Sequence, residues 1–290
     1  MTVLRNGENI GMADLAGTSD SDIFRMMVGV APEQRTPAGV RTPDASYKPA
    51  INVRNLSGTA ISEVSFEVLK GEIVGVAALA GQGQRELFRM LAGAARIARG
   101  TVEIAGRPVR LASPAQALRA GIGFLPEDRK SEGIFLGLAT ATNISLPIVG
   151  QLLRFGLIES RRERRRVAEQ ARRVDLAERS LHMNIATLSG GNQQKALLAR
   201  VLISGAQNLV LFDPTRGVDV GTKQVIYGVI RRFVQAGGSV LIYSTELAEL
   251  VQLVHRCLVM YRGRIIGEVA GNALSEARLV SLATGHVEAT

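Results

Sequence analysis

Short, continuous apolar runs separated by glycine- and proline-containing segments dominate most of the chain. Ile73–Ala77 and Leu209–Phe212 are such runs, and Val240–Leu247 contains the last one predicted for the core. Runs of this length, bounded by turn residues, are typical of strands that are buried on both faces of a parallel sheet. Ile51–Leu56 and Ile61–Leu69 alternate between apolar and polar residues instead, which predicts strands with one exposed face. The pattern therefore predicts an α/β fold.

A glycine-containing loop joins the run at Ile73–Ala77 to a helical segment that continues through Phe88 and Leu91. Strand, glycine loop and helix in this order form the context of a P-loop, in which backbone N–H groups bind phosphates. In the pattern G-x-x-x-x-G-K-[ST], Ala78 takes the place of the first glycine and Gly83 that of the second. The loop is therefore predicted to keep the shape of a phosphate-binding site.

Two chemical contacts of the P-loop pattern are absent from this loop. Gln84 stands at the lysine that reaches the terminal phosphates, and it carries no charge. Arg85 stands at the hydroxyl that binds Mg²⁺, and its guanidinium repels a metal ion. The predicted nucleotide contacts of this degenerate loop are Ala78, Gly81, Gly83, Gln84, Arg85 and Glu86.

A second candidate for phosphate binding is the string LSGGNQQK at 188–195, which precedes helix formers at 196–202. Ser189 can cap this helix, because its side-chain oxygen can accept from a backbone N–H of the first turn. Gly190 and Gly191 have no side chains to obstruct these N–H groups. Such a helix start attracts anions, since its free donors and the positive end of its dipole point the same way. Taken without the rest of the string, a serine and two glycines are also typical of an ordinary capped helix.

Residues 3–29 resemble residues 259–285 without a gap. Six aligned positions are identical, against roughly two expected by chance. Val3 meets Val259 and Gly11 meets Gly267, for example. The repeat predicts a tandem duplication, in which residues 1–30 are the tail of a first copy and residues 51–290 are a second copy. Between them, residues 31–50 contain four prolines and scattered polar residues, which predicts a linker.

The composition indicates the compartment in which the chain is expected to function. Its single cysteine, Cys257, excludes an intrachain disulfide and indicates a reducing compartment. The longest apolar run, around Ile73–Ala80, is too short to cross a bilayer. Met1–Gly11 lacks the basic start and apolar block of a signal peptide. We therefore expect neither a membrane span nor export.

The formal net charge of +9 would suit nucleic acid or an anionic membrane surface. Much of this charge lies on one predicted helix, in Arg161, Arg162, Arg164, Arg165, Arg166, Arg172 and Arg173. A charge run of this kind is usually a solvated helix face. With four tyrosines and no tryptophan, the chain also offers few stacking platforms for single strands. We expect no nucleic-acid partner.

The string LSGGNQQK resembles the signature motif of ATP-binding-cassette (ABC) proteins. PEDRK at 126–130 resembles the second cassette of bacterial sugar-import ATPases of the ribose, xylose and galactose type. The resemblance covers nearly all of residues 51–290. It implies the P-loop NTPase fold of an ABC cassette, with a mixed sheet core and an inserted helical subdomain at about 128–187. Residues 1–30 would then be the tail remnant of a first cassette.

The resemblance also assigns functional positions. The signature residues would be Leu188, Ser189, Gly190, Gly191, Asn192 and Gln193. Glu127 stands where the family has a glutamine that touches the metal and the attacking water, and Thr245 where it has a γ-phosphate-sensing histidine. Asp219 falls at the D-loop aspartate, which meets the opposite cassette.

The family pattern of four apolar residues followed by Asp, Glu, Pro and Thr admits two alignments here. Anchoring on Pro214 places Phe212 at the metal-binding aspartate and Asp213 at the catalytic glutamate. With a one-residue deletion, Asp213 becomes the metal ligand and no general base remains. In either alignment one carboxylate does the work of two.

In an ABC dimer each nucleotide lies between the P-loop of one cassette and the signature of the other. The departures at 84, 85, 127, 212, 213 and 245 all weaken the chain's own nucleotide site, whereas its signature is intact. We therefore expect ATP as the cofactor, Mg²⁺ mainly at the partner's site and no metal held by this chain. Hydrolysis by the chain alone should be weak or absent.

The resemblance implies an ATP-binding subunit that couples ATP binding and hydrolysis to carbohydrate uptake. Its partners would be a first cassette or a second copy, the membrane permease and, indirectly, a periplasmic sugar-binding protein. Its place would be the cytoplasmic face of the bacterial inner membrane, as a peripheral protein. A nucleoside importer ATPase and a non-catalytic regulatory or scaffold module remain alternatives. A nucleic-acid-associated ABC ATPase is a weaker one, because PEDRK and the repeat argue against it.

Overall fold

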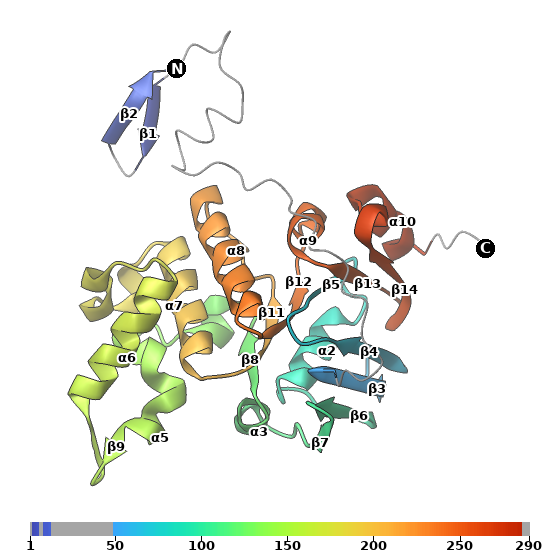
Figure 1. The fold of residues 1–290 in the computed structure, drawn as a ribbon, viewed down its shortest axis with the longest axis horizontal. Helices are drawn as coiled ribbons and strands as arrows, with labels where there is room; N and C mark the ends of the chain where they lie inside the picture. Colours follow the sequence, from blue (N-terminus) through green and yellow to red (C-terminus); the bar gives the residue numbers. More distant parts are fainter. Residues whose placement is uncertain (1, 6–7, 13–48, 286–290) are drawn as a thin grey trace.

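The fold is that of a computed structural model, which describes residues 2–5, 8–12 and 49–285. Its central sheet has six strands in the order β14-β13-β5-β12-β11-β8 (Figure 1). The strands are β5 (Ile73–Ala77), β8 (Ile122–Leu125), β11 (Asn208–Phe212), β12 (Ser239–Tyr243), β13 (Arg256–Tyr261) and β14 (Arg264–Ala270). Five of them run parallel, and β14 is an antiparallel edge strand. The prediction that the core ends with the Val240–Leu247 strand was wrong, because β13 lies beside β5 inside the sheet.

The continuous apolar runs form the buried strands, as predicted. Every residue of β5, β11 and β12 is buried. Neighbouring residues of β11 point to opposite faces, so that Leu209 and Leu211 enter one core and Val210 and Phe212 the other.

A four-stranded antiparallel sheet faces the central sheet across one helix. Its order is β4-β3-β6-β7, and its strands are β3 (Ile51–Ser57), β4 (Val64–Val68), β6 (Arg99–Ile104) and β7 (Arg107–Val109). Residues of β4 alternate between buried and exposed, which confirms one exposed face. Helix α2 (Gln84–Leu91) shares a core with both sheets through Leu87, Phe88 and Leu91.

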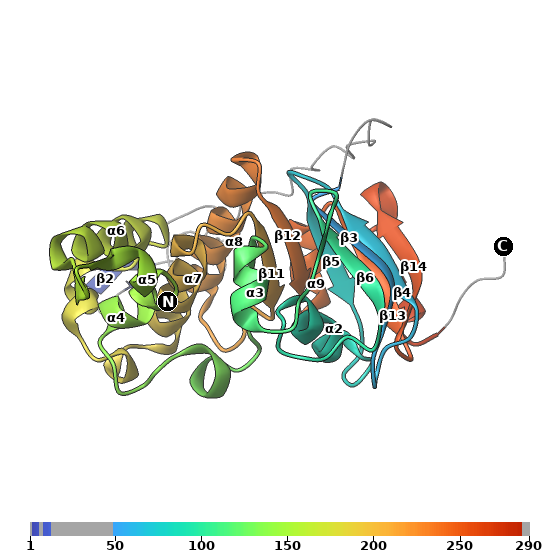
Figure 2. The same ribbon diagram turned by 90° about the horizontal axis from the view of Figure 1, so that it is seen from below.

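The segment at 128–187 forms a subdomain at the opposite end from the four-stranded sheet (Figures 1 and 2). Its α-helices are α4 (Thr140–Ser145), α5 (Val149–Leu152) and α6 (Ser160–Arg173). Single turns occur at Arg129–Gly133, Leu146–Ile148, Glu178–His182 and Ile185–Thr187. The segment is not wholly helical as predicted, because β9 (Leu153–Arg154) and β10 (Leu157–Ile158) form a hairpin between α5 and α6.

The remaining helices connect and cover the central sheet. They are α3 (Pro114–Arg119), α7 (Gly190–Ile203), α8 (Val220–Gln235), α9 (Leu247–Leu253) and α10 (Glu276–Ala283), with a short turn at Gly271–Ala273. Helix α7 packs against α4, α6 and β8, and so joins the helical subdomain to the sheet. Among the helices of the described ranges, none has the length and apolar character that a membrane span needs.

The N-terminal hairpin has the same register as the hairpin at the far end of the chain. β1 (Thr2–Arg5) and β2 (Glu8–Met12) pair as Thr2↔Met12, Val3↔Gly11, Leu4↔Asn9 and Arg5↔Glu8. β13 and β14 pair as Leu258↔Glu268, Val259↔Gly267, Met260↔Ile265 and Tyr261↔Arg264. The irregularity falls at the same step in both, and all four pairs are related by the offset of the sequence repeat. The remainder of the proposed tail and linker, residues 13–48, lies outside the described residues.

Candidate functional site

The loop between β5 and α2 is held in shape by backbone contacts. Gly83 caps α2 with φ 96°, and a Cβ there would lie 2.8 Å from the carbonyl oxygen of Ala60, so that glycine is required. The turn between β13 and β14 supports the loop from the side. The backbone N–H of Gly263 donates to the carbonyl of Gln82 at 3.1 Å, and that of Arg262 donates to its side-chain oxygen at 2.5 Å.

Gln84 turns inward instead of facing a ligand. Its side-chain amide donates to the carbonyl of Leu79 at 3.0 Å and to the Tyr243 hydroxyl at 3.3 Å. The residue is buried, and its side-chain carbonyl oxygen has no hydrogen-bond partner. At the position where a P-loop has its lysine, Gln84 therefore ties the loop to the central sheet.

Glu86 also has a structural contact. Its carboxylate accepts from the backbone N–H groups of Thr59, Ala60 and Ile61 at 2.6–3.0 Å. This predicted loop residue therefore holds the connection between β3 and β4.

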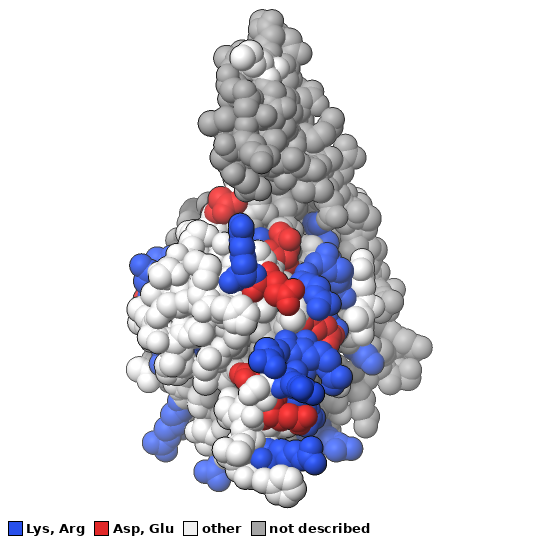
Figure 3. All heavy atoms as spheres, turned by 90° about the vertical axis from the view of Figure 1, so that its left-hand side faces the viewer, with Lys and Arg blue, Asp and Glu red and all other residues white. Residues whose placement is uncertain are grey.

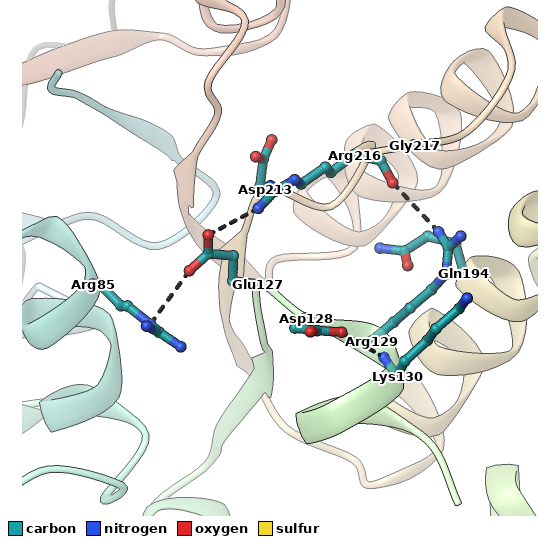
Figure 4. Close-up of a pocket in the computed structure, with 9 residues that line it drawn as sticks. All are labelled: Arg85, Glu127, Asp128, Arg129, Lys130, Gln194, Asp213, Arg216 and Gly217. Atoms are coloured by element: carbon teal, nitrogen blue, oxygen red, sulfur yellow. Dashed lines mark hydrogen bonds and ion pairs between the residues drawn. The ribbon is translucent and has the colours of Figure 1, made fainter. Parts of the chain in front are cut away.

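Two arginines flank Glu127 in front of the loop. Arg85 Nε lies 3.3 Å from one carboxylate oxygen, and Arg216 donates to the other at 2.8 Å (Figure 4). Glu132 takes a further contact from Arg85 at 3.1 Å and one from Arg89 at 2.8 Å. Each pair is partly solvated and therefore weak alone. Together these paired charges occupy the position at which a P-loop protein binds its metal ion.

Asp213 and Thr245 are in contact. The Thr245 hydroxyl donates to the Asp213 carboxylate at 3.0 Å, and its backbone N–H does so at 3.4 Å. Asp213 is 3% exposed and has φ 51°. Burial raises the pKa of this carboxyl group, and the hydrogen bonds from Thr245 only partly offset the rise.

Phe212 precedes Asp213 and packs among aromatic rings. Its ring lies 5.3 Å from that of Phe88 on α2 and 4.5 Å from that of Tyr243, centroid to centroid. An apolar ring therefore occupies the side of β11 that faces the P-loop helix.

These groups line a polar cavity of about 470 Å³. Its lining consists of Arg85, Glu127, Asp128, Arg129, Lys130, Gln194, Asp213, Arg216 and Gly217 (Figure 4). Four cationic and three anionic side chains share this space. Because three of the cations are arginines, the cavity is a poor site for Mg²⁺.

The predicted signature forms a capped helix start. Ser189 is exposed and is the N-cap of α7, where its hydroxyl oxygen accepts from the backbone N–H of Asn192 at 3.4 Å. Leu188 and Gln193 are buried, and the Gln193 amide donates to the carbonyls of Ile185 and Leu188 at 3.1 and 3.2 Å. Ser189 is therefore the exposed residue of the motif, and Gly190 and Asn192 are partly exposed.

The D-loop position lies against this helix start. Asp219 caps α8 and accepts from Thr222 through its backbone N–H at 2.9 Å and its hydroxyl at 2.8 Å. A Cβ added to Gly191 would lie 2.6 Å from that hydroxyl and 3.2 Å from the Asp219 carboxylate. The glycine therefore permits the two loops to touch.

Sequence reasoning missed two residues that join the subdomains. Arg129 donates to the carbonyl of Arg216 at 3.4 Å, and its guanidinium lies against Gly190. Gln194 donates to the carbonyl of Pro214 at 2.6 Å. Both residues belong to strings already singled out, PEDRK and LSGGNQQK, but the motifs alone did not indicate these contacts.

Comparisons with known proteins agree on one family. The ABC transporter family profile matches residues 61–216, which is more than half of the chain. Among curated relatives, "Ribose import ATP-binding protein RbsA 1" of Rhizobium johnstonii is 38% identical over 289 residues, covering 97% of this chain and 56% of the relative. "Putative ribose/galactose/methyl galactoside import ATP-binding protein 3" of Agrobacterium fabrum is 39% identical over 289 residues, covering 99% and 57%. The chain thus spans about half the length of these relatives.

Solved structures show the same fold at low sequence identity. A nucleotide-free ATP-binding cassette from an ABC transporter superposes with a TM-score of 0.68 at 19% identity, covering 81% of this chain and 98% of that one. A dimeric, post-hydrolysis ATP-binding cassette bound to ADP and phosphate gives 0.66 at 19% identity, covering 76% and 98%. The predicted cassette fold is confirmed.

Proposed function

The chain belongs to the ABC transporter family, and from this premise we propose that it is an ATP-binding cassette of a sugar importer whose signature completes a partner's nucleotide site. Relatives that cover nearly all of the chain carry ribose or ribose/galactose import names, which supports a sugar rather than a nucleoside as cargo. Because the chain spans about half of each relative, a first cassette or a second copy would supply the other half-site.

One observation carries this proposal: the exposed, Ser189-capped start of α7 lies beside a cavity of this chain that three arginines line. The capped start offers backbone N–H donors and a positive dipole end to an anion outside the chain. Asp219 touches the same helix start, so a partner that docks there meets both motifs at once.

The chain's own site does not fit Mg²⁺. Arg85 stands at the hydroxyl ligand, Phe212 places a ring beside the P-loop helix, and Asp213 is bonded to Thr245. We therefore assign no metal-dependent step to this cavity. If its glycine loop keeps the backbone shape that cradles phosphates, nucleotide binding here would be weak and independent of metal.

The division of roles follows from these two sites. The partner's site would hold ATP with Mg²⁺, whose charge stabilises the transferring phosphoryl group. Ser189 and the N–H groups that follow it would orient the γ-phosphate there and exclude water. Arg129 and Gln194 link α7 to the loop after β11, so that closure would move the helical subdomain as one unit against the permease. The chain would then lie at the cytoplasmic face of the inner membrane, with a periplasmic sugar-binding protein as an indirect partner.

ATP hydrolysis by the chain alone and by a tandem protein with a restored first cassette tests this proposal. We expect little activity from the chain alone and robust, Mg²⁺-dependent activity from the tandem protein. Ser189→Ala in the tandem protein should lower its kcat about tenfold or more. Ser275→Ala is the matched control, because Ser275 caps α10 in the same way and is remote from both sites. Robust activity of the isolated chain that survives Asp213→Ala would refute the asymmetric assignment.

A non-catalytic scaffold is the second candidate, and the inward position of Gln84 is the observation that favours it. The same experiment separates the two candidates. A scaffold predicts that Ser189→Ala leaves the activity of the tandem protein unchanged.

A further inference from the structure

The hairpin of residues 153–158, here called the apolar hairpin, projects its side chains into solvent. Phe155 is 93% exposed and Leu157 76%, and Leu153 and Ile158 are each nearly half exposed. Large apolar side chains gathered at this level of exposure are unusual for a free surface and indicate a site of interaction. The proposed nucleotide chemistry leaves this feature unexplained.

The apolar hairpin presents apolar side chains on both faces. Leu153 pairs with Ile158, so that these two share one face, and Leu157 pairs with Arg154 on the other. Phe155 and Gly156 form the two-residue turn with φ 51° and 81°, the geometry of a tight hairpin turn. A flat protein surface could cover only one face of this projection, whereas a fluid medium such as a lipid interface can surround both.

Basic side chains follow directly after the apolar hairpin. Helix α6 begins at Ser160, and Arg161, Arg162, Arg164 and Arg165 all lie exposed within about 10 Å of its start along the axis. In the described part of the chain none of these four has an acidic partner. Of the other arginines of this helix, Arg166 contacts Gln151 at 2.9 Å and Arg173 contacts Glu169 at 2.7 Å, and Arg172 lies exposed in the last turn.

The acidic residues within α6 do not cancel this charge. Glu163 accepts from the Ser145 hydroxyl at 2.6 Å, which directs it toward α4, and Glu169 pairs with Arg173. Figure 3 shows this side of the molecule, where Lys and Arg side chains form a stripe that also contains Asp and Glu side chains.

We propose that the apolar hairpin and the first half of α6 form a docking surface for an anionic lipid bilayer. Phe155 and Leu157 would enter the headgroup region, and the four arginines would contact anionic headgroups beside them. Arg154, whose guanidinium lies 5.6 Å from the Phe155 ring centroid, would reach the same headgroups. The proposal does not depend on either nucleotide site.

The absence of tryptophan from the chain makes insertion directly measurable. Phe155→Trp supplies a single fluorophore at the tip. On vesicles of phosphatidylcholine with phosphatidylglycerol, and without nucleotide, its emission should shift to shorter wavelength and be quenched by brominated acyl chains. Val280→Trp is the control, because Val280 is exposed on α10, and its emission should not change. Unchanged emission of the Phe155→Trp variant on anionic vesicles overturns the proposal.

Vesicle co-sedimentation of the full chain tests the charge component. R161Q/R162Q/R164Q/R165Q should weaken binding to anionic vesicles about tenfold or more. R96Q/R99Q/R107Q/R110Q removes the same charge from exposed arginines at the opposite end of the molecule and should retain binding within about twofold. Equal losses in the two variants would show a non-specific effect of net charge and overturn the proposal. So would binding of the apolar hairpin to purified permease with no affinity for vesicles.

Discussion

At the residue scale, Asp213 shows why the chain's own nucleotide site is poorly suited to a metal ion. Its carboxylate is buried and accepts from Thr245, and burial raises its pKa. A raised carboxyl pKa means that the folded state prefers the protonated form. The stability that this preference contributes is present below the ordinary pKa and is lost as the pH rises through the raised value.

Asp213→Asn should therefore stabilise the chain at neutral pH. Removal of the buried charge should raise the Tm at pH 7 by about 2–4 °C, and the gain should vanish in acid, where Asp213 is protonated in both states. Thermal unfolding as a function of pH measures this. Asp128→Asn is the control, because hydrogen bonds from Ser131 and Lys130 lower the pKa of that exposed carboxyl group, and we expect no rise. A lower Tm for Asp213→Asn at pH 7 would show that a bound cation or donor stabilises the carboxylate.

Gly191 is a second position at which an added methyl group should change the stability of the chain. Gly191→Ala would press a methyl group onto Thr222 and Asp219 and should lower the free energy of unfolding by about 1–2 kcal/mol in denaturant titrations. Gly150→Ala meets open space on α5 and should be neutral or slightly stabilising. Equal effects of the two substitutions would contradict the close approach of α7 and α8.

The motifs assign residues to each site, but they do not indicate the bonds between them. Thr245 meets Asp213 because each follows a buried strand, and these strands are neighbours in the sheet. The inward position of Gln84 depends on Tyr243, which is distant in sequence. No local pattern carries that information.

At the element scale, a buried polar network joins α8, α9 and the end of β12. Glu249 on α9 accepts from the hydroxyls of Thr215 at 2.5 Å and Ser244 at 2.8 Å, and it pairs with Lys223 on α8 at 2.9 Å. Burial alone would raise the pKa of Glu249, but these partners outweigh it and lower the pKa.

Glu249→Gln should lower the free energy of unfolding by about 2–3 kcal/mol at pH 7, because it leaves Lys223 with one partner fewer in a buried setting. The difference from the wild type should shrink as the pH falls through the lowered pKa, where the wild type loses this contribution. Glu246→Gln removes the exposed partner of the same lysine and should cost about 0.5 kcal/mol or less. Denaturant titrations measure both, and similar losses would contradict the role of burial.

Sequence patterns predicted the strands better than their partners. The buried strands follow from continuous apolar runs, whereas the place of β13 beside β5 depends on pairing across much of the chain. The β9–β10 hairpin escaped prediction because each strand has two residues, too few for a period to show. Its apolar residues also lie on the surface, where the buried pattern does not apply.

At the scale of the whole molecule, the two nucleotide half-sites differ in chemistry. In the chain's own cavity Arg85 and Arg216 pair with Glu127, whereas the first turn of α7 contains no acidic residue and Asp219 lies beside it. Composition could not predict this difference, since it depends on which charged side chains the fold brings to each site.

Restoring the home site should make it dependent on metal. Gln84→Lys with Arg85→Thr returns the ammonium and the hydroxyl ligand, and we expect ATP to bind about tenfold or more tightly, with the gain abolished by a chelator. Titration with a fluorescent ATP analogue measures this. Arg89→Thr is the control, because it removes an arginine that shares Glu132 but does not face the loop. A gain that persists with chelator would contradict the assignment of position 85 to the metal.

The β13–β14 turn holds the loop between β5 and α2 through two hydrogen bonds to Gln82. The last hairpin of the cassette therefore also stabilises its phosphate-binding loop. The chain carries a second hairpin of identical register at its other end. If the chain derives from a tandem duplication, that hairpin would stabilise the phosphate-binding loop of another cassette. In that cassette β1 would lie beside the strand that leads into the phosphate-binding loop, as β13 lies beside β5 here.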